Sequence, residues 1–167
     1  MGQEPQKARG AELLVVDDPV FDEHAATSNH PERPARLDAA RSGLARAGVP
    51  TLRPLAKDVD RALLERVHDP SYLETLERLR GARGMIDSDT YVAPRSVEAA
   101  HRAAGAAQAL AEGLLDGVAS TGVAMVRPPG HHAEPARAMG FCLLNNAAVA
   151  AMAAHRRGVE RVAIIDF

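Results

Sequence analysis

Residues 127–146 read RPPGHHAEPARAMGFCLLNN, and residues 161–167 read RVAIIDF. The first stretch follows a short apolar run, Val123–Val126, which is typical of a buried strand. Its prolines and glycines predict a loop from Arg127 to Leu143, and the Ala-rich residues Asn145–Arg157 predict a helix. The second stretch is apolar again and predicts another strand. A strand, a loop, a helix and a strand in that order indicate a parallel α/β unit.

The upstream chain extends this alternation. Glu12–Asp17 predicts a buried strand, and apolar spacing predicts helical segments over Pro34–Ala47, Val59–Val67, Ser71–Leu79 and Pro94–Gly117. We therefore predict an α/β fold of three layers, α/β/α, around a parallel sheet. Residues 1–10 are polar and without periodicity, and are expected to form a disordered leader, whereas residues 11–167 show no linker or repeat.

Composition excludes several classes of function. The chain has 167 residues and a formal net charge of −2, so it offers no basic field for nucleic-acid backbones. No stretch approaches the roughly 18 apolar residues of a membrane span. One cysteine, Cys142, rules out an intramolecular disulfide framework and favours a reducing compartment, so the cytoplasm is the expected location.

The predicted loop carries the residues that indicate chemistry. Two prolines restrict the backbone before His131 and His132, and long loops in compact domains are usually functional. One imidazole could serve as general base and the other as its partner, with Asp166 at the end of the next predicted strand as the orienting acid. Two alternatives remain open at this point: a solvated pair on a surface loop, and a metal site that spacing alone does not complete.

Other polar residues have simpler interpretations. Cys142 is expected to be a buried packing residue, and Asn145 and Asn146 are expected to cap the following helix or bond the loop. His30 and His68, each near a proline at a helix start, are expected to be structural, whereas His101 and His155 are expected to be solvated.

Several motifs together resemble one family. The chain contains HPERPARL at 30–37, HDPSYL at 68–73, DSDT at 87–90, RPPGHH at 127–132, GFCLLNN at 140–146 and IIDF at 164–167. In this order and spacing they resemble the histone deacetylase superfamily, which includes acetylpolyamine amidohydrolases and acetoin-utilisation proteins. The resemblance implies the arginase/deacetylase type of parallel sheet and a zinc-dependent hydrolase that removes an acyl group from a lysine or a polyamine.

The resemblance also implies roles for individual residues. His131 matches the family histidine that is paired with an acid, His132 matches the general base that activates the attacking water, and Asp166 matches the acid on the first histidine. Asp166 further matches a residue that helps to bind potassium in relatives. The substrate-binding matches are Gly140 and Phe141 in the tunnel wall, Arg36 near the tunnel floor and Asp89 at the rim.

The zinc ligands of the family are expected to be missing from this chain. In relatives the strand that ends in Ile-Asp-Phe continues into Asp-x-His-His-Gly, which supplies the first ligands, and a further Asp and a Tyr follow later. We therefore expect residues 11–167 to be the N-terminal part of a single, truncated deacetylase domain. Alternatives are an inactive fragment and an acyl-binding or interaction module. An exposed sheet edge is expected to make the isolated chain marginal or prone to aggregation.

Overall fold

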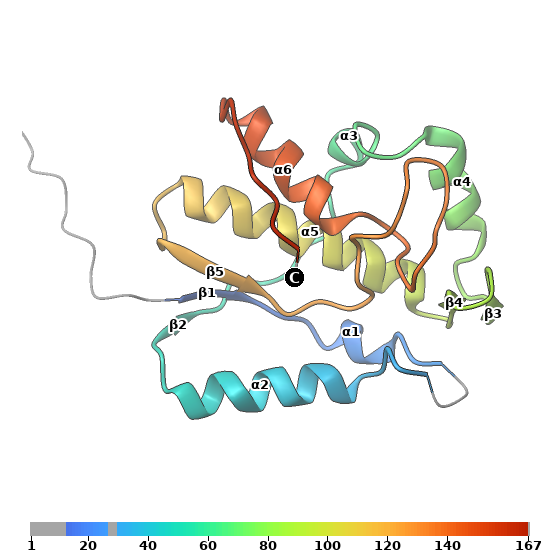
Figure 1. Ribbon diagram of the computed structural model, residues 1–167, viewed down its shortest axis with the longest axis horizontal. Coiled ribbons are helices and arrows are strands. Elements are labelled where there is room, and N and C mark those ends of the chain that lie inside the picture. Colours follow the sequence, from blue (N-terminus) through green and yellow to red (C-terminus); the bar gives the residue numbers. More distant parts are fainter. Residues whose placement is uncertain (1–12, 27–29, 167) are drawn as a thin grey trace, which may run out of the picture.

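The computed structural model describes residues 13–26 and 30–166, so the predicted leader lies outside the described residues. The described residues form six helices and five strands, arranged as in Figure 1. In chain order they are β1 (Leu13–Val16), α1 (Val20–Glu23), α2 (Ala35–Ala47), β2 (Thr51–Leu52), α3 (Arg61–Leu64), α4 (Pro70–Arg78), β3 (Gly84–Met85), β4 (Tyr91–Val92), α5 (Ser96–Leu115), β5 (Thr121–Ala124) and α6 (Asn146–Arg156).

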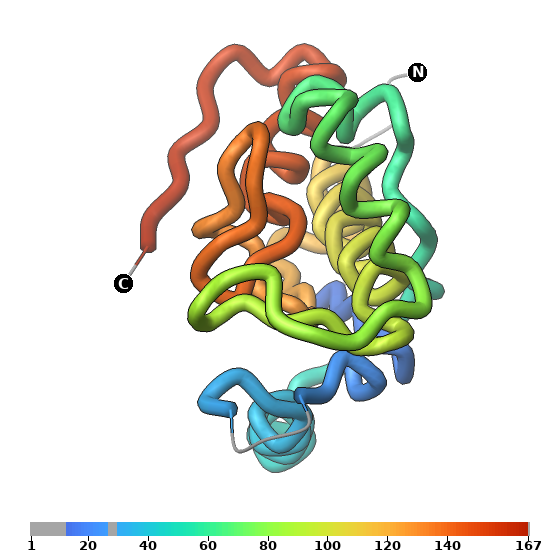
Figure 2. The backbone as a smooth tube through the Cα atoms, turned by 90° about the vertical axis from the view of Figure 1, so that its right-hand side faces the viewer, coloured from blue at the N-terminus to red at the C-terminus, as the bar shows by residue number. Residues whose placement is uncertain are grey.

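The main sheet is parallel, with the order β2-β1-β5. Leu13 pairs with Thr51 on one side and with Thr121 on the other, so β1 is the central strand. Helix α2 lies on one side of the sheet, whereas α5 and α6 lie on the opposite side (Figures 1 and 2). This arrangement confirms the predicted α/β class with a parallel sheet. β3 and β4 form a separate antiparallel hairpin.

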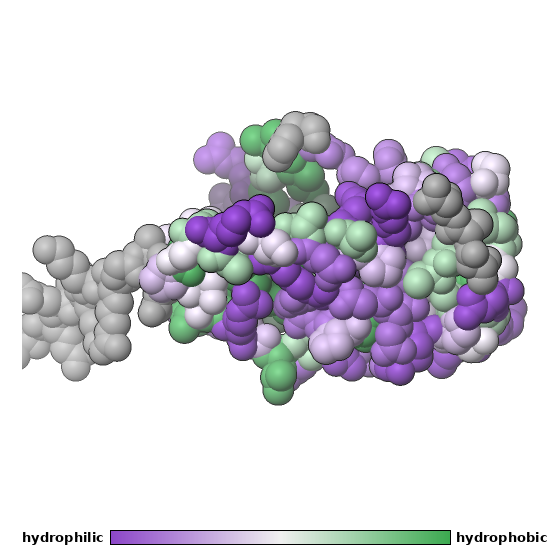
Figure 3. All heavy atoms as spheres, turned by 90° about the horizontal axis from the view of Figure 1, so that it is seen from below, coloured by the Kyte–Doolittle hydropathy of each residue, from purple (hydrophilic) through white to green (hydrophobic). Residues whose placement is uncertain are grey.

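Small residues allow α5 to pack closely in the middle of the molecule. Its buried residues include Ala99, Ala103 and Ala106 on the side of the sheet, and Ala100 and Ala104 on the side of α6. Gly105 lets the helix approach the 57–59 backbone, because a Cβ there would lie 1.9 Å from the Lys57 carbonyl oxygen. The face that carries α2 is mainly hydrophilic (Figure 3), and Leu37 is the buried residue of that helix.

Two predictions about local structure are wrong. Residues 161–166 form no strand, because a strand requires a hydrogen-bonded neighbour and this segment pairs with none of the described strands. Phe167, the last residue of that predicted strand, lies outside the described residues. His101 is not solvated: its side chain is 15% exposed, and Nε2 lies 2.7 Å from Glu77 Oε1. His101 belongs to α5, which packs against the sheet on one side and against α6 on another, and a single apolar stripe in the sequence does not reveal the second side.

Apolar surface remains open beside the C-terminal segment. A groove of about 490 Å³ lies between α5, α6 and residues 159–164. Ile164 and Ile165 are 61% and 84% exposed, and Val123 on β5 is also exposed. Exposed apolar side chains next to an unpaired strand edge favour association. Among the described residues, no helix combines the length and apolarity needed to cross a membrane.

Candidate active site

The loop that follows β5 begins at a buried arginine. The Arg127 guanidinium is 2% exposed and binds both carboxylate oxygens of Glu32, at 2.6 and 2.7 Å. It also donates to the backbone carbonyls of Phe21 and His24, at 2.8 and 2.6 Å. A buried ion pair is tolerated only when the remaining donors and acceptors are satisfied, as they are for this guanidinium. The start of the loop is therefore fixed to Phe21, His24 and Glu32.

His24 lies within the same buried cluster. Its ring stacks on Tyr91 with a centroid separation of 4.4 Å, and Nδ1 lies 2.6 Å from the Ser96 hydroxyl. Burial lowers the pKa of His24 to about 4, although the Glu32 carboxylate at 3.6 Å opposes that shift. The side chain is therefore neutral at pH 7, and Nε2 has no hydrogen-bond partner among the described residues.

A second histidine holds the end of the loop. His68 Nδ1 donates to the Glu134 carbonyl at 3.0 Å, and His68 Nε2 accepts the Asn145 amide at 2.9 Å. The structural role expected for His68 agrees with these contacts, and burial lowers its pKa. The Tyr72 hydroxyl donates to the Leu143 carbonyl at 2.6 Å. Side chains of α4 and its preceding turn therefore stabilise the loop where backbone pairing is sparse.

The loop also packs tightly against the start of α6. The Asn145 side chain accepts the Ala148 amide, so the expected helix cap is present. The Asn146 side chain donates to the Pro128 carbonyl at 3.2 Å. A Cβ at Gly130 would lie 2.4 Å from the Asn146 nitrogen, so glycine is required beside the helix start. Gly130 therefore allows the loop backbone to pack directly against the first turn of α6.

The two adjacent histidines lie at the exposed side of this loop. Their ring centroids are 4.2 Å apart with an interplanar angle of 57°. His131 Nδ1 lies 2.8 Å from Asp166 Oδ2, although the two residues are 35 positions apart in the chain. The carboxylate fixes the ring when Nδ1 carries the proton, which leaves Nε2 as an acceptor. The side chains of His131 and Asp166 are 47% and 65% exposed.

A tight turn places Gly140 and Phe141 beside His132. Met139 and Cys142 exchange backbone hydrogen bonds at 3.1 and 2.9 Å, which closes a two-residue turn. Both turn residues have positive φ, 55° and 71°, as a type I′ turn requires. A Cβ on Gly140 would lie 2.8 Å from the His132 ring, so only glycine fits against that imidazole.

Cys142 is fully buried behind this turn, as expected for a packing residue. Its Sγ donates to the Gly140 carbonyl at 3.2 Å, and burial raises the pKa of the thiol to about 11. A neutral thiol of this kind is a poor nucleophile near pH 7.

The remaining candidates differ in their distance from the loop. Asp89 is close to it, because Thr90 Oγ1 accepts the Phe141 amide and donates to Asp89 Oδ1. Arg36 lies at the start of α2 with a side chain that is 60% exposed, and its contact toward the site is Glu32, at 3.6 Å. The structure therefore brings Asp89 to the turn and leaves Arg36 at the far side of Glu32.

The buried cluster of Glu32, His24 and Arg127 was missed by sequence reasoning. Glu32 lies inside the HPERPARL motif, which is the one local signal that could have pointed to it, but its partner Arg127 is 95 residues away. Within residues 13–26 and 30–166, no group of three or more His, Cys, Asp or Glu side chains could hold a metal ion. The described residues thus present a paired imidazole system but do not by themselves fit a zinc ion.

Comparison with known proteins gives consistent matches. A family model for the histone deacetylase domain matches residues 30–167. Histone deacetylase 15 of Arabidopsis thaliana is 42% identical over 142 residues, which cover 83% of this chain and 26% of that protein. Human polyamine deacetylase HDAC10 is 37% identical over 147 residues, covering 81% of this chain and 22% of that protein. An uncharacterised protein of Synechocystis is 40% identical, with coverage of 93% and 53%.

A solved structure supports the same fold. The crystal structure of the HDA15 HD domain superposes with a TM-score of 0.83 at 37% identity, over 89% of this chain and 44% of that one. The chain thus spans between about a fifth and about half of the length of these relatives.

Proposed function

Because this chain belongs to the histone deacetylase domain family, we propose that the intact protein hydrolyses the amide of an acylated amine, either an acetylated lysine or an acetylated polyamine. One of its relatives is a polyamine deacetylase by name. The observation that carries the proposal is the hydrogen bond of 2.8 Å between His131 and Asp166, directly beside His132. Residues 11–167 would form the N-terminal part of a single deacetylase domain.

The reaction needs a base and a proton donor. Water adds to the amide carbonyl, the C–N bond breaks, and the amine leaves with a proton. We assign removal of the proton from water, and its transfer to the leaving nitrogen, to His132, because Gly140 gives its ring a fixed position. We assign stabilisation of the negative charge that develops on the carbonyl oxygen to His131, because Asp166 orients that ring. Asp166 would also be available to a potassium ion.

Zinc belongs to the proposal for the intact protein only. As a Lewis acid it would polarise the amide carbonyl and lower the pKa of water. The described residues hold no group of three suitable donors, so we propose that the ligands of the metal would come from outside this part of the chain. Gly140 and Phe141 would line the path of the acylated stem, with Asp89 at its rim and Arg36 behind Glu32.

An activity assay of the intact gene product tests this proposal. Acetyl-lysine peptides and acetylated polyamines are offered separately, with and without a chelator. His132→Ala should lower kcat by about 10²- to 10⁴-fold, as expected for loss of a general base. His155→Ala is the matched control, because His155 is exposed on α6. Turnover that is unchanged in His132→Ala, or insensitive to chelation, refutes the proposal.

A second proposal concerns the 167-residue chain on its own. The absence of a three-donor group among residues 13–26 and 30–166 favours an inactive module that binds an acylated ligand or a partner without hydrolysis. Isothermal titration of the purified chain with Zn²⁺ separates the two cases. Stoichiometric binding below micromolar concentration would contradict the inactive module.

A further inference from the structure

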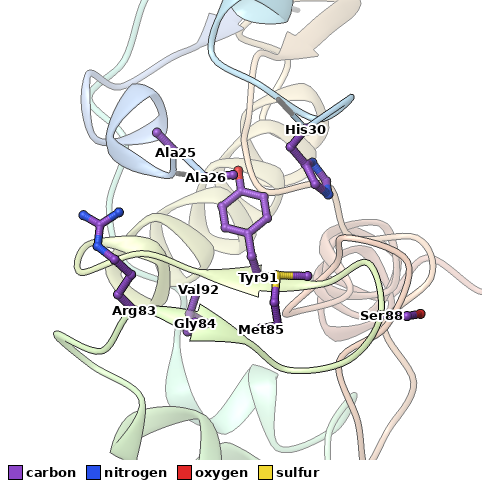
Figure 4. Close-up of a pocket in the computed structure, with 9 residues that line it drawn as sticks. All are labelled: Ala25, Ala26, His30, Arg83, Gly84, Met85, Ser88, Tyr91 and Val92. Atoms are coloured by element: carbon purple, nitrogen blue, oxygen red, sulfur yellow. The ribbon is translucent and has the colours of Figure 1, made fainter. Parts of the chain in front are cut away.

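His30 lies between residues 25–26, the β3–β4 hairpin and the turn that carries Phe141. It lines a pocket of about 250 Å³ between the β3–β4 hairpin and residues 25–26, together with Tyr91 and Met85 (Figure 4). The ring centroids of His30 and Tyr91 are 4.9 Å apart, with an interplanar angle of 71°. His30 is therefore part of the pocket wall as well as a neighbour of the candidate site.

Both ring nitrogens of His30 are satisfied by backbone groups. Nδ1 lies 3.1 Å from both the backbone nitrogen and the backbone oxygen of Glu32, and Nε2 lies 3.0 Å from the Asp89 carbonyl oxygen. The ring is thus held at both ends, between the segment that anchors Arg127 and the hairpin tip that carries Asp89.

The edge of the same ring packs against Phe141. The centroids are 4.8 Å apart and the planes are inclined by 80°, which is the favourable edge-to-face arrangement of aromatic rings. Phe141 has a φ of 71°, a conformation that non-glycine residues adopt only where their surroundings hold them. Its backbone amide is held by Thr90 Oγ1, at 3.1 Å, and the ring is held by His30.

These contacts close a circuit of four residues. His30 binds the backbone of Asp89, the Asp89 carboxylate binds Thr90, Thr90 binds the backbone of Phe141, and Phe141 packs on His30. We propose that His30 is a positioning residue that holds Phe141 and Asp89 at one spacing and thereby sets the affinity for the acylated stem. This role rests on the proposed function, since it assigns substrate contacts to Phe141 and Asp89.

Kinetics of the intact protein test the effect on substrate. His30→Ala removes the ring and both hydrogen bonds, and should raise KM for an acetyl-lysine peptide by about tenfold while kcat stays within about twofold. His30→Phe retains a ring beside Phe141 but loses the bond to Asp89, and should recover part of that increase. A fall in kcat at unchanged KM overturns the proposal.

A spectroscopic measurement tests the positioning itself without any turnover. The chain has three phenylalanines, so a fluorophenylalanine-labelled sample gives three ¹⁹F resonances. His30→Ala should move the Phe141 resonance and leave that of the buried Phe21 in place, and His155→Ala should move neither. An unmoved Phe141 resonance overturns the proposal. If the intact wild-type protein hydrolyses no acylated amine, the proposed function fails and the ¹⁹F spectrum alone decides the role of His30.

Discussion

Acid should destabilise this protein through His24, a buried histidine that is not assigned to catalysis. Desolvation is the main cause that lowers the pKa of His24 from 6.5 in an exposed chain to about 4, and the nearby Arg127 and His30 act in the same direction. Glu32 is the one carboxylate that opposes them. Because the folded-state pKa is the lower one, the unfolded chain binds the proton first. Stability is therefore complete above about pH 6.5 and falls as the pH drops toward 4.

The size of this effect follows from the two pKa values. A tenfold difference in proton affinity is about 1.4 kcal/mol, so the shift from 6.5 to about 4 costs about 3 kcal/mol once the pH is below 4. Between pH 7 and pH 5 the expected loss from His24 is about 2 kcal/mol. That is a large part of the total stability of an ordinary domain.

Urea denaturation followed by far-UV circular dichroism measures this loss, with the free energy of unfolding determined at half-unit steps from pH 7 to pH 4.5. His24→Phe is the matched variant, because it keeps a flat ring against Tyr91 and cannot titrate. His68 and His101 also have pKa values lowered by burial, and both are present in each protein, so the difference between the two curves isolates His24. Parallel curves for the wild type and His24→Phe would refute the reasoning.

Three further predictions concern stability and association. Glu32→Gln leaves Arg127 buried with a broken ion pair and should lower the free energy of unfolding by about 3–5 kcal/mol, measured by urea denaturation; a loss below about 1 kcal/mol contradicts it. Gly105→Ala drives a Cβ into the Lys57 carbonyl and should cost about 1–3 kcal/mol in thermal melts. Gly43→Ala, where the Cβ meets only the tip of Arg46 at 4.0 Å, should instead stabilise α2 by about 0.5–1 kcal/mol. Ile165→Lys should reduce self-association, measured by light scattering. Leu55 is as exposed as Ile165 but lies in another part of the molecule, so Leu55→Lys should leave self-association unchanged. Equal scattering by the two variants would argue against the apolar C-terminal segment as the cause.

Sequence patterns predicted the parts of the fold that depend on local periodicity. Helices α2, α4, α5 and α6 were expected within one to two residues of their ends, because their apolar positions repeat at helical spacing. The predicted strand was wrong over residues 161–166 because apolar composition indicates what could pair, whereas pairing itself requires a neighbouring strand. The two-residue strands β2, β3 and β4 are too short to leave any pattern.

In the candidate site, too, local sequence predicted some features, and contacts between distant residues decided the others. The sequence placed His131 and Asp166 at the ends of successive elements, and the structure brings their side chains to 2.8 Å; their roles in catalysis stay predictions. The bonds between Arg127 and Glu32 could not be anticipated, because nothing local links residues 95 positions apart. The same holds for His30, which sequence reasoning treated as structural and which contacts Phe141 across 111 positions.

The anchoring of Arg127 by Phe21, His24 and Glu32 has a consequence for chimeric proteins. If residues 127–143 of this chain are moved into a host protein, Arg127 needs a carboxylate at the position that Glu32 occupies here. A host without that carboxylate would bury one unmatched charge. The loop and its anchoring residues therefore form one recombination block, and crossover points belong outside both.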